Sequence, residues 1–351
     1  MDESTLSRLA EFEKDDKFYD ALQFYRTKVT RSFRLKNASD AAIPLVKHSL
    51  DFFFKAVQYQ CAIDMLTLYI ECLSKNNSET STAAFELIAK NVARLADFAE
   101  VERDSGNQQN ENVLVAARGK CVDLTIQWTK QKENSKYGNA EFHRILANAF
   151  LEAGRVELAK THFLLSDDVI GFSRFVCGDS SNEVAIVEII AQILCLDRFP
   201  FAVDMFSACV NPKKYPFSQP LLNFQHLLFE AIEAENIDQF SELSDTYKTE
   251  IERSSLLAGF LTKIGQLYFG ICDGQANFPG LGGLLQGLMG GQSDDKMAAT
   301  SHLSAPRAAN RRPAKMDNPL FSLGATAAAT ATAQKSSESN LKKLDVDDDL
   351  D

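Results

Sequence analysis

The sequence lacks an apolar run long enough to cross a membrane. A spanning helix needs roughly 18 or more predominantly apolar residues, whereas the best candidate, Val184–Leu196, is shorter and contains Glu188 and Gln192. The first residues, MDESTLSRL, are acidic and polar, which is not the pattern of a secretory signal peptide. We therefore expect no signal peptide and no direct insertion into a membrane.

Paired cysteines are also missing. The seven cysteines are an odd number, are scattered, and form no Cys-x-x-Cys motif. Cys61, Cys72, Cys195 and Cys209 lie among apolar residues with helical spacing, where buried free thiols are the usual outcome. Together with the polar N-terminus, this pattern predicts a reducing, cytosolic location.

Motifs for catalysis or cofactor binding are absent from the sequence. Gly280, Gly282 and Gly283 precede no βαβ unit, so they form neither a dinucleotide fingerprint nor a phosphate-binding loop. The five histidines are far apart, and none are paired at metal-ligand spacing on one helix. His143 and His162 are expected to face each other across a hairpin, as packed or solvent-edge residues rather than metal ligands. We therefore expect no enzymatic activity, no metal and no cofactor.

The charge distribution is uneven. The net charge of −11 argues against general nucleic-acid binding, and residues 292–351 carry only −1 of it. Between Ala21 and Ser39, however, there is no carboxylate. This basic patch is either a solvated helix face or a docking surface for an acidic partner, because arginine binds carboxylates bidentately. Its cations are Arg26, Lys28, Arg31, Arg34 and Lys36.

A helical pattern is present along most of the chain, and it is clearest at Ala140–Asp168. Apolar residues recur there at i, i+3, i+4, i+7 and i+8, as on one face of a helix. The pattern stops at Ala153-Gly154, where glycine supplies a left-handed turn, and then resumes. Two such short helices cannot bury their apolar faces alone. The sequence predicts an all-α fold, an α-solenoid of stacked antiparallel helical hairpins.

The same periodicity predicts further helices, and no segment of useful length alternates like a β-strand. The first helix is expected to end near residues 15–17. Ser39-Asp40 is expected to cap a later helix that carries Pro44 near its first turn. The proline-rich segment Asn211–Pro220 is expected to be an ordered excursion and an internal boundary. Other helices are expected at 83–99, 113–130, 184–196, 200–210, 221–234 and 256–269.

The composition changes after Phe269. Residues 280–291, GLGGLLQGLMGG, form either a linker or a short apolar face that covers the end of the solenoid or seats a partner helix. Residues 292–351 are rich in Ala, Ser, Thr and Asp and cannot bury enough surface to offset chain entropy. They are expected to form a disordered C-terminal tail.

Several motifs together resemble the guided-entry-of-tail-anchored-proteins factor four family. They are KFYDALQFYRT (17–27), QPLLNF (219–224), IGQLYFG (264–270) and GGLLQGLMG (282–290), which occur in the family's order and spacing. The resemblance covers about residues 5–291. It implies a cytosolic helical adaptor that performs no covalent chemistry and passes newly made tail-anchored membrane proteins towards the endoplasmic reticulum.

The resemblance also implies partners for each half of the chain. It assigns residues 1–139 to docking of the dimeric targeting ATPase of this pathway. Residues 140–291 are assigned to a ubiquitin-like protein and a BAG-family scaffold protein, and residues 292–351 form the tail. No nucleic-acid partner is expected.

Matching the family motifs residue by residue gives two candidate sites. Phe18 stands where tyrosine is usual in the family, so the hydrogen bond of that hydroxyl is lost. The ATPase-docking candidates are Phe18, Arg34 and Asp64, which match the family's aromatic, arginine and aspartate positions, together with Tyr19 and Arg26 nearby. The candidates for the ubiquitin-like or BAG-family partner are Phe224, Leu228, Tyr268, Phe269, Leu284, Leu285 and Leu288.

Two alternative functions follow from the residues alone. One is a helical-repeat scaffold subunit of another multiprotein complex, such as a regulatory-particle or translation-factor subunit; the lack of a C-terminal winged-helix pattern counts against that type. The other is an RNA-binding solenoid that uses the basic patch, although exposed aromatic residues for base stacking are not evident beside it.

Overall fold

The structure is a computed structural model, and it describes the chain except for residues 1–2, 35–37, 134, 179–181, 212 and 272–351. All regular secondary structure in the described part is helical, which confirms the predicted all-α fold. The chain forms two compact units, Met1–Asp168 and Val169–Asp351. The expected division of partner sites at residue 139 stays a prediction, and the proposed tail and the 280–291 segment lie outside the described residues.

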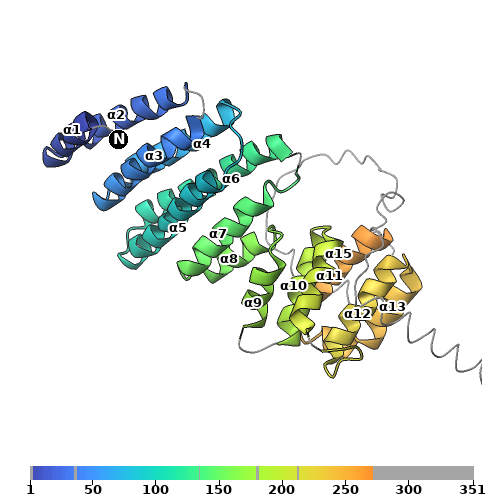
Figure 1. The fold of residues 1–351 in the computed structure, drawn as a ribbon. Helices are drawn as coiled ribbons and strands as arrows, with labels where there is room; N and C mark the ends of the chain where they lie inside the picture. The colour runs from blue at the N-terminus through green and yellow to red at the C-terminus, as the bar shows by residue number, and fades with distance from the viewer. Residues whose placement is uncertain (1–2, 35–37, 134, 179–181, 212, 272–351) are drawn as a thin grey trace, which may run out of the picture. The chain divides into compact units, whose positions relative to one another are not determined.

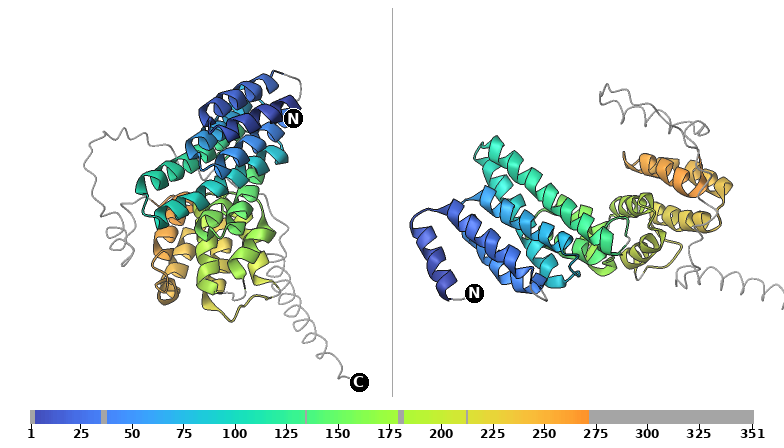
Figure 2. Two further views of the ribbon diagram at one scale, coloured as in Figure 1. Left: turned by 90° about the vertical axis from the view of Figure 1, so that its left-hand side faces the viewer. Right: turned by 90° about the horizontal axis from the view of Figure 1, so that it is seen from above.

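The N-terminal unit is a stack of helical hairpins in chain order, drawn from blue to green in Figures 1 and 2. Within it, α2 packs on α4, α4 on α6, α3 on α5, and α5 on α7, so odd- and even-numbered helices form two layers. The helices are α1 (Glu3–Lys14), α2 (Phe18–Ser32), α3 (Ala38–Lys55), α4 (Tyr59–Lys75), α5 (Thr82–Asp104), α6 (Gln108–Glu133), α7 (Ala140–Glu152) and α8 (Val156–Phe163).

Six hairpins in the two units close with the same backbone turn. In each, one residue adopts a left-handed conformation, and the next residue donates its N–H to the carbonyl five positions back. At the predicted turn, Gly154 has φ +72° and Arg155 donates to Phe150 O at 2.8 Å, which confirms that turn. Only two of the six left-handed positions are glycine, so the backbone bond defines the turn more than residue type does. They are Asp16, Val57, Gly106, Gly154, Asp197 and Glu235.

Side chains of the linkers fix where some helices begin. Ser81 Oγ accepts a hydrogen bond from Ala84 N at 3.2 Å, and Asn139 Oδ1 accepts one from Phe142 N at 2.8 Å. Each side chain satisfies a backbone donor that has no partner inside its helix. These caps start α5 and α7, which pack on each other in the odd-numbered layer.

The expected start of α3 was wrong. The helix already begins at Ala38, so Ser39-Asp40 lies inside its first turn, and Pro44 lies within the helix rather than near its start. Because proline has no backbone N–H, Pro44 cannot donate to the carbonyl of Asp40, and α3 continues past the missing bond. The apolar face that follows, with buried Val46, Leu50 and Phe53, holds the helix together across this point.

The C-terminal unit packs around α10. This helix contacts α11, α12 and α15, and α9 packs mainly on α11. The helices at 184–196, 200–210, 221–234 and 256–269 were predicted, whereas α9, α13 and α14 were not. The elements are α9 (Val169–Cys177), α10 (Glu183–Cys195), α11 (Phe199–Val210), α12 (Pro220–Glu233), α13 (Ile237–Thr246), α14 (Lys248–Ile251) and α15 (Leu257–Phe269).

A buried carboxylate joins three parts of this unit. Glu183, in the first turn of α10, is only 8% exposed. Its carboxylate accepts hydrogen bonds from Leu221 N at 3.1 Å and from the Arg253 guanidinium. Because Leu221 lies in the first turn of α12, the carboxylate satisfies a free backbone donor and also pairs with a cation. This contact ties α10 to α12 and to the segment before α15.

The Asn211–Pro220 segment is an excursion between α11 and α12, as predicted. Asn223 of α12 anchors it: its Oδ1 accepts a hydrogen bond from Phe217 N at 2.7 Å, and its Nδ2 donates one to Phe217 O at 2.8 Å. The Phe217 ring packs against Phe206 of α11. The segment therefore lies inside the C-terminal unit, and the expected internal boundary falls instead at Asp168.

Candidate functional site

The two aromatic candidates for ATPase docking differ in exposure. Phe18 begins α2 and is half-buried, with its ring centroid 6.0 Å from that of Phe52 on α3. Tyr19 is 71% exposed. Phe18 therefore stabilises the hairpin packing, and Tyr19 is the ring that α2 presents to solvent.

The charged candidates lie on α2, directly after it, and on α4. Among the described residues, Arg26, Arg31 and Arg34 have no ion-pair partner. Arg26 is half-buried beside α4, where its charge partly offsets the rise that burial causes in the pKa of Cys72. Asp64 of α4 accepts a hydrogen bond from Gln60 Nε2 at 3.1 Å. The structure thus brings the five predicted residues onto or beside two helices that pack directly together.

This α2–α4 surface combines an exposed ring with unpaired guanidinium groups. Guanidinium groups without internal partners remain free to bind carboxylates in a bidentate geometry. The arrangement suits recognition of a protein surface that carries carboxylates and an apolar contact. Tyr19, Arg26 and Asp64 are supplied by helices, so their geometry is formed before binding, whereas Arg34 lies in the turn that follows α2.

A neighbouring groove between α1 and α2 was not predicted. It encloses about 460 Å³, and its walls carry the aromatic rings of Phe12 and Phe24. The Arg8 guanidinium lies 5.8 Å from the Phe12 centroid and 5.3 Å from that of Phe24, and Lys28 Nζ lies 5.6 Å from the latter. A sequence signal existed: Arg8 and Phe12 are four residues apart on one helix, where they share a face. We name this feature the α1–α2 groove.

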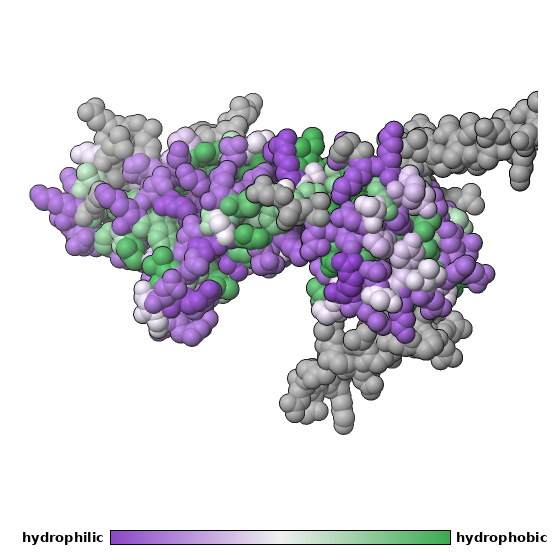
Figure 3. Space-filling view, turned by 90° about the horizontal axis from the view of Figure 1, so that it is seen from below, coloured by the Kyte–Doolittle hydropathy of each residue, from purple (hydrophilic) through white to green (hydrophobic). Residues whose placement is uncertain are grey.

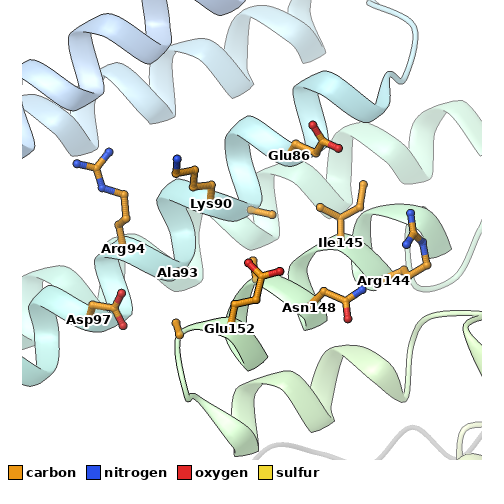
Figure 4. A pocket seen from close by; sticks show the side chains of 12 residues that line it. Glu86, Lys90, Ala93, Arg94, Asp97, Arg144, Ile145, Asn148 and Glu152 are labelled. Atoms are coloured by element: carbon orange, nitrogen blue, oxygen red, sulfur yellow. The ribbon is translucent and has the colours of Figure 1, made fainter. Parts of the chain in front are cut away.

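A second groove of about 600 Å³ lies between α5 and α7 (Figure 4). It exists because small side chains line part of it, including Ala89, Ala93 and Ala149. Charged residues of both signs point into it from the two helices. Several of these charges are already paired: Arg94 bonds Asp51 at 2.7 Å, Arg144 bonds Glu141 at 2.5 Å, and Asp97 accepts from Arg155 at 3.0 Å. Glu86, Lys90 and Glu152, which also line the groove, have no ion-pair partner among the described residues.

The expected histidine pair forms the buried contact between α7 and α8. His143 Nδ1 and His162 Nδ1 are 2.9 Å apart, and His143 Nε2 lies 3.0 Å from Tyr137 O. Because a carbonyl only accepts, His143 carries a proton on Nε2 and donates it to Tyr137 O. Burial lowers the pKa of His162 to about 3, with smaller contributions from His143 and Arg118. Both rings are therefore packed core residues, and His162 is neutral at neutral pH.

The predicted residues of the second partner site lie in or near the core of the C-terminal unit. Phe224 and Leu228 are fully buried. Tyr268 is half-buried, and its hydroxyl donates to Leu194 O at 3.1 Å. Phe269 stacks on Phe240 with centroids 4.6 Å apart. Each has a packing role within the unit, and their contact with a partner stays a prediction; Leu284, Leu285 and Leu288 lie outside the described residues.

Other surface features of the described chain are limited. The view in Figure 3 shows a mostly hydrophilic surface with small, separate hydrophobic patches. None of the described helices combines the length and the apolar character needed to cross a membrane. Within the same residues, no group of three or more His, Cys, Asp or Glu side chains is placed to hold a metal ion.

The described chain is thus a helical-repeat protein in which an exposed ring, Tyr19, and arginines without ion-pair partners among the described residues lie on and beside α2. The family model of Golgi to ER traffic protein 4 matches residues 36–289. The chain therefore belongs to the Golgi to ER traffic protein 4 family, which confirms the resemblance noted in the sequence.

Individual relatives match over most of their length. Golgi to ER traffic protein 4 homolog B of Xenopus laevis is 28% identical over 85% of this chain and 90% of its own. The homolog of Homo sapiens is 27% identical over 82% of this chain and 86% of its own, and that of Dictyostelium discoideum is 23% identical over 83% and 90%. The crystal structure of C. therm. Get4 is 17% identical and covers 79% of this chain and 100% of its own, with a TM-score of 0.42.

Proposed function

We propose that this chain is a non-catalytic cytosolic adaptor in the post-translational targeting of tail-anchored membrane proteins to the endoplasmic reticulum. In this role it links the dimeric targeting ATPase to a ubiquitin-like protein and a BAG-family scaffold protein. Membership of the Golgi to ER traffic protein 4 family supports the general role. The observation that carries the docking assignment is the α2–α4 surface, where Tyr19 is exposed and Arg26 and Arg34 have no ion-pair partner among the described residues.

The ATPase-docking part is tested with one charge reversal in the full chain. Arg34→Glu is expected to weaken binding to the purified dimeric ATPase by about tenfold or more, because an attraction becomes a repulsion. Lys47→Glu, on α3 and also exposed, is the matched control and should bind like the wild type. Circular dichroism and the melting temperature should be unchanged in both. An equal loss of folding in Arg34→Glu would make Arg34 structural, and unaltered binding would remove it from the docking surface.

The second partner site is tested separately. Replacing Leu284, Leu285 and Leu288 by Asp in the full chain is expected to abolish capture of the ubiquitin-like or BAG-family partner and to leave ATPase binding intact. Retention of both partners would show that the 280–291 segment does not carry this site. Failure of the unmodified chain to capture either partner from cytosol would instead favour a scaffold role in another complex.

A further inference from the structure

We infer that the α1–α2 groove is a docking site for this chain's own residues Leu344–Asp351, LDVDDDLD. The groove belongs to the outermost hairpin of the N-terminal unit, and in that unit α1 packs on α2. Its lining carries three cations and one carboxylate, together with two aromatic rings. It is therefore a positive and partly apolar trough on a chain whose net charge is −11.

The geometry of the groove indicates which kind of ligand it would fit. Arg8 and Lys28 both lie over the Phe24 ring, so cationic groups and an aromatic ring are close together in the groove. Arg31 lines the same groove and has no ion-pair partner among the described residues. A ligand that fits this arrangement must offer several carboxylates and a few apolar side chains in a short segment. A purely acidic peptide would offer no apolar side chain to the rings of Phe12 and Phe24.

Residues 344–351 have that composition. Five of the eight are aspartate, the other three are Leu344, Val346 and Leu350, and none is basic. The match is thus in charge and in apolar character, and this combination does not recur elsewhere in the sequence after residue 271. Docking of an acidic segment on unpaired arginines gains charge-assisted hydrogen bonds that neither group makes alone.

The chain between the described part and this segment is long enough to allow the contact. Residues 272–343 supply 72 positions, and at about 3.3 Å per residue they can span on the order of 240 Å. Tethering makes the encounter intramolecular, so a weak contact is populated without a high protein concentration. The inference concerns groove residues other than the five ATPase-docking candidates and does not depend on the proposed function.

Zero-length crosslinking of the full chain tests the contact directly. A carbodiimide joins an amine to a carboxylate only when they meet, so it should couple Lys28 to an aspartate among residues 345–351, identified by mass spectrometry. The double variant Arg8→Glu/Arg31→Glu keeps the Lys28 amine and should reduce this product about tenfold. Lys120→Glu, an exposed site on α6, should leave it unchanged. The Lys75–Glu71 ion pair on α4, at 3.0 Å, should crosslink equally in all variants and so provides an internal standard for the efficiency of the reaction.

An equal mixture of isotopically heavy and light chains decides whether the occupant comes from the same molecule. Crosslinked peptides that are both heavy or both light support the inference, whereas mixed pairs in statistical proportion would assign the groove to a second copy and overturn it. A fluorescent peptide of residues 341–351 gives an independent readout. It should bind the full-chain variant with all five aspartates of 345–351 changed to Asn about tenfold more tightly than the wild type, whose groove is occupied. Equal binding to both chains would overturn the inference, as would absence of the Lys28 product.

Discussion

The two units of the chain are built from the same hairpin but are assembled differently. In the N-terminal unit the main contacts join helices at most two positions apart, as in a linear repeat. In the C-terminal unit α15 returns to α10, five helices earlier, and covers it. Two contacts between a side chain and a backbone carbonyl join α15 to α10: the Tyr268 hydroxyl donates to Leu194 O at 3.1 Å, and the Cys195 thiol lies 3.6 Å from Phe260 O.

This difference decides what each terminal helix does. The first helix, α1, packs on one neighbour, so it can present one side as a groove without exposing a core. The last described helix, α15, supplies buried Leu261 and Ile264 to a core that also contains α10. A linear stack thus leaves its end available for recognition, whereas a closed unit uses its last helix for stability.

The largest expected effect comes from opening the closed unit. Ile264 is fully buried in α15, and Ile264→Ala should lower the free energy of unfolding by about 2–5 kcal/mol through lost burial and a cavity. The only tryptophan of the chain, Trp128, lies in α6, so its fluorescence reports the N-terminal unit. Urea unfolding should shift to lower urea by circular dichroism, and the Trp128 transition should not move.

A matched change in the linear stack sharpens this test. Phe12→Ala removes a half-buried ring from α1, which contacts one neighbour, and should cost about 1 kcal/mol. A cost equal to that of Ile264→Ala would contradict the distinction between an open and a closed end. A joint shift of the fluorescence and circular dichroism transitions in Ile264→Ala would show that the two units unfold as one.

The sequence predicted the elements of both units better than their assembly. Amphipathic periodicity located the long helices, because a helix that stacks on its neighbour needs one continuous apolar face. The closure of α15 on α10 left no such signal, since its contacts join residues more than 60 positions apart, as between Cys195 and Phe260. The helices α13 and α14 have only 10 and 4 residues, so any periodic pattern in them extends over a short stretch of sequence.

The candidate site was predictable only in part, because the sequence shows where charges occur but not which helix faces meet. Unusual charge without nearby carboxylates marked the basic patch on α2, and the family motifs added Tyr19 and Asp64. The α1–α2 groove depends on which side of α2 meets α1, and one sequence does not define that pairing. Burial of Phe224 and Leu228 likewise depends on the closed packing of the C-terminal unit.

The next prediction concerns how the stability of each unit depends on pH. His162 has a pKa near 3 in the folded chain, against an ordinary value of 6.5. Between these values the unfolded chain binds the extra proton, so stability falls as pH drops below about 6.5, by up to about 1.4 kcal/mol per pH unit. Above pH 6.5 this contribution does not change. Urea unfolding followed by Trp128 fluorescence at pH 8, 6 and 5 measures the slope.

Carboxylates also titrate in this range, so the comparison needs a variant. His162→Gln should lower the slope of unfolding free energy against pH by the amount due to one titrating proton. This holds even if the substitution also changes the stability at pH 8. His226 in the C-terminal unit has a pKa that burial lowers and Glu230 partly restores, so His226→Gln should change the slope less. Equal slopes in the wild type and His162→Gln would mean that the α7–α8 contact tolerates a protonated His162.

The smallest effect tests the turn that both units share. Val57 and Glu235 adopt left-handed conformations, with φ of +58° and +51°, and both side chains are exposed. Glycine removes the steric cost of this conformation but adds chain entropy to the unfolded state, so Val57→Gly should stabilise by about 0.5–1 kcal/mol. Glu235→Gly should gain less, because glutamate is not β-branched. Gly154→Ala should lose a similar amount, since alanine carries a Cβ into the same conformation. Denaturation midpoints measure all three changes, and a loss of stability in Val57→Gly would mean that the exposed valine stabilises the α3–α4 turn by more than its backbone conformation costs.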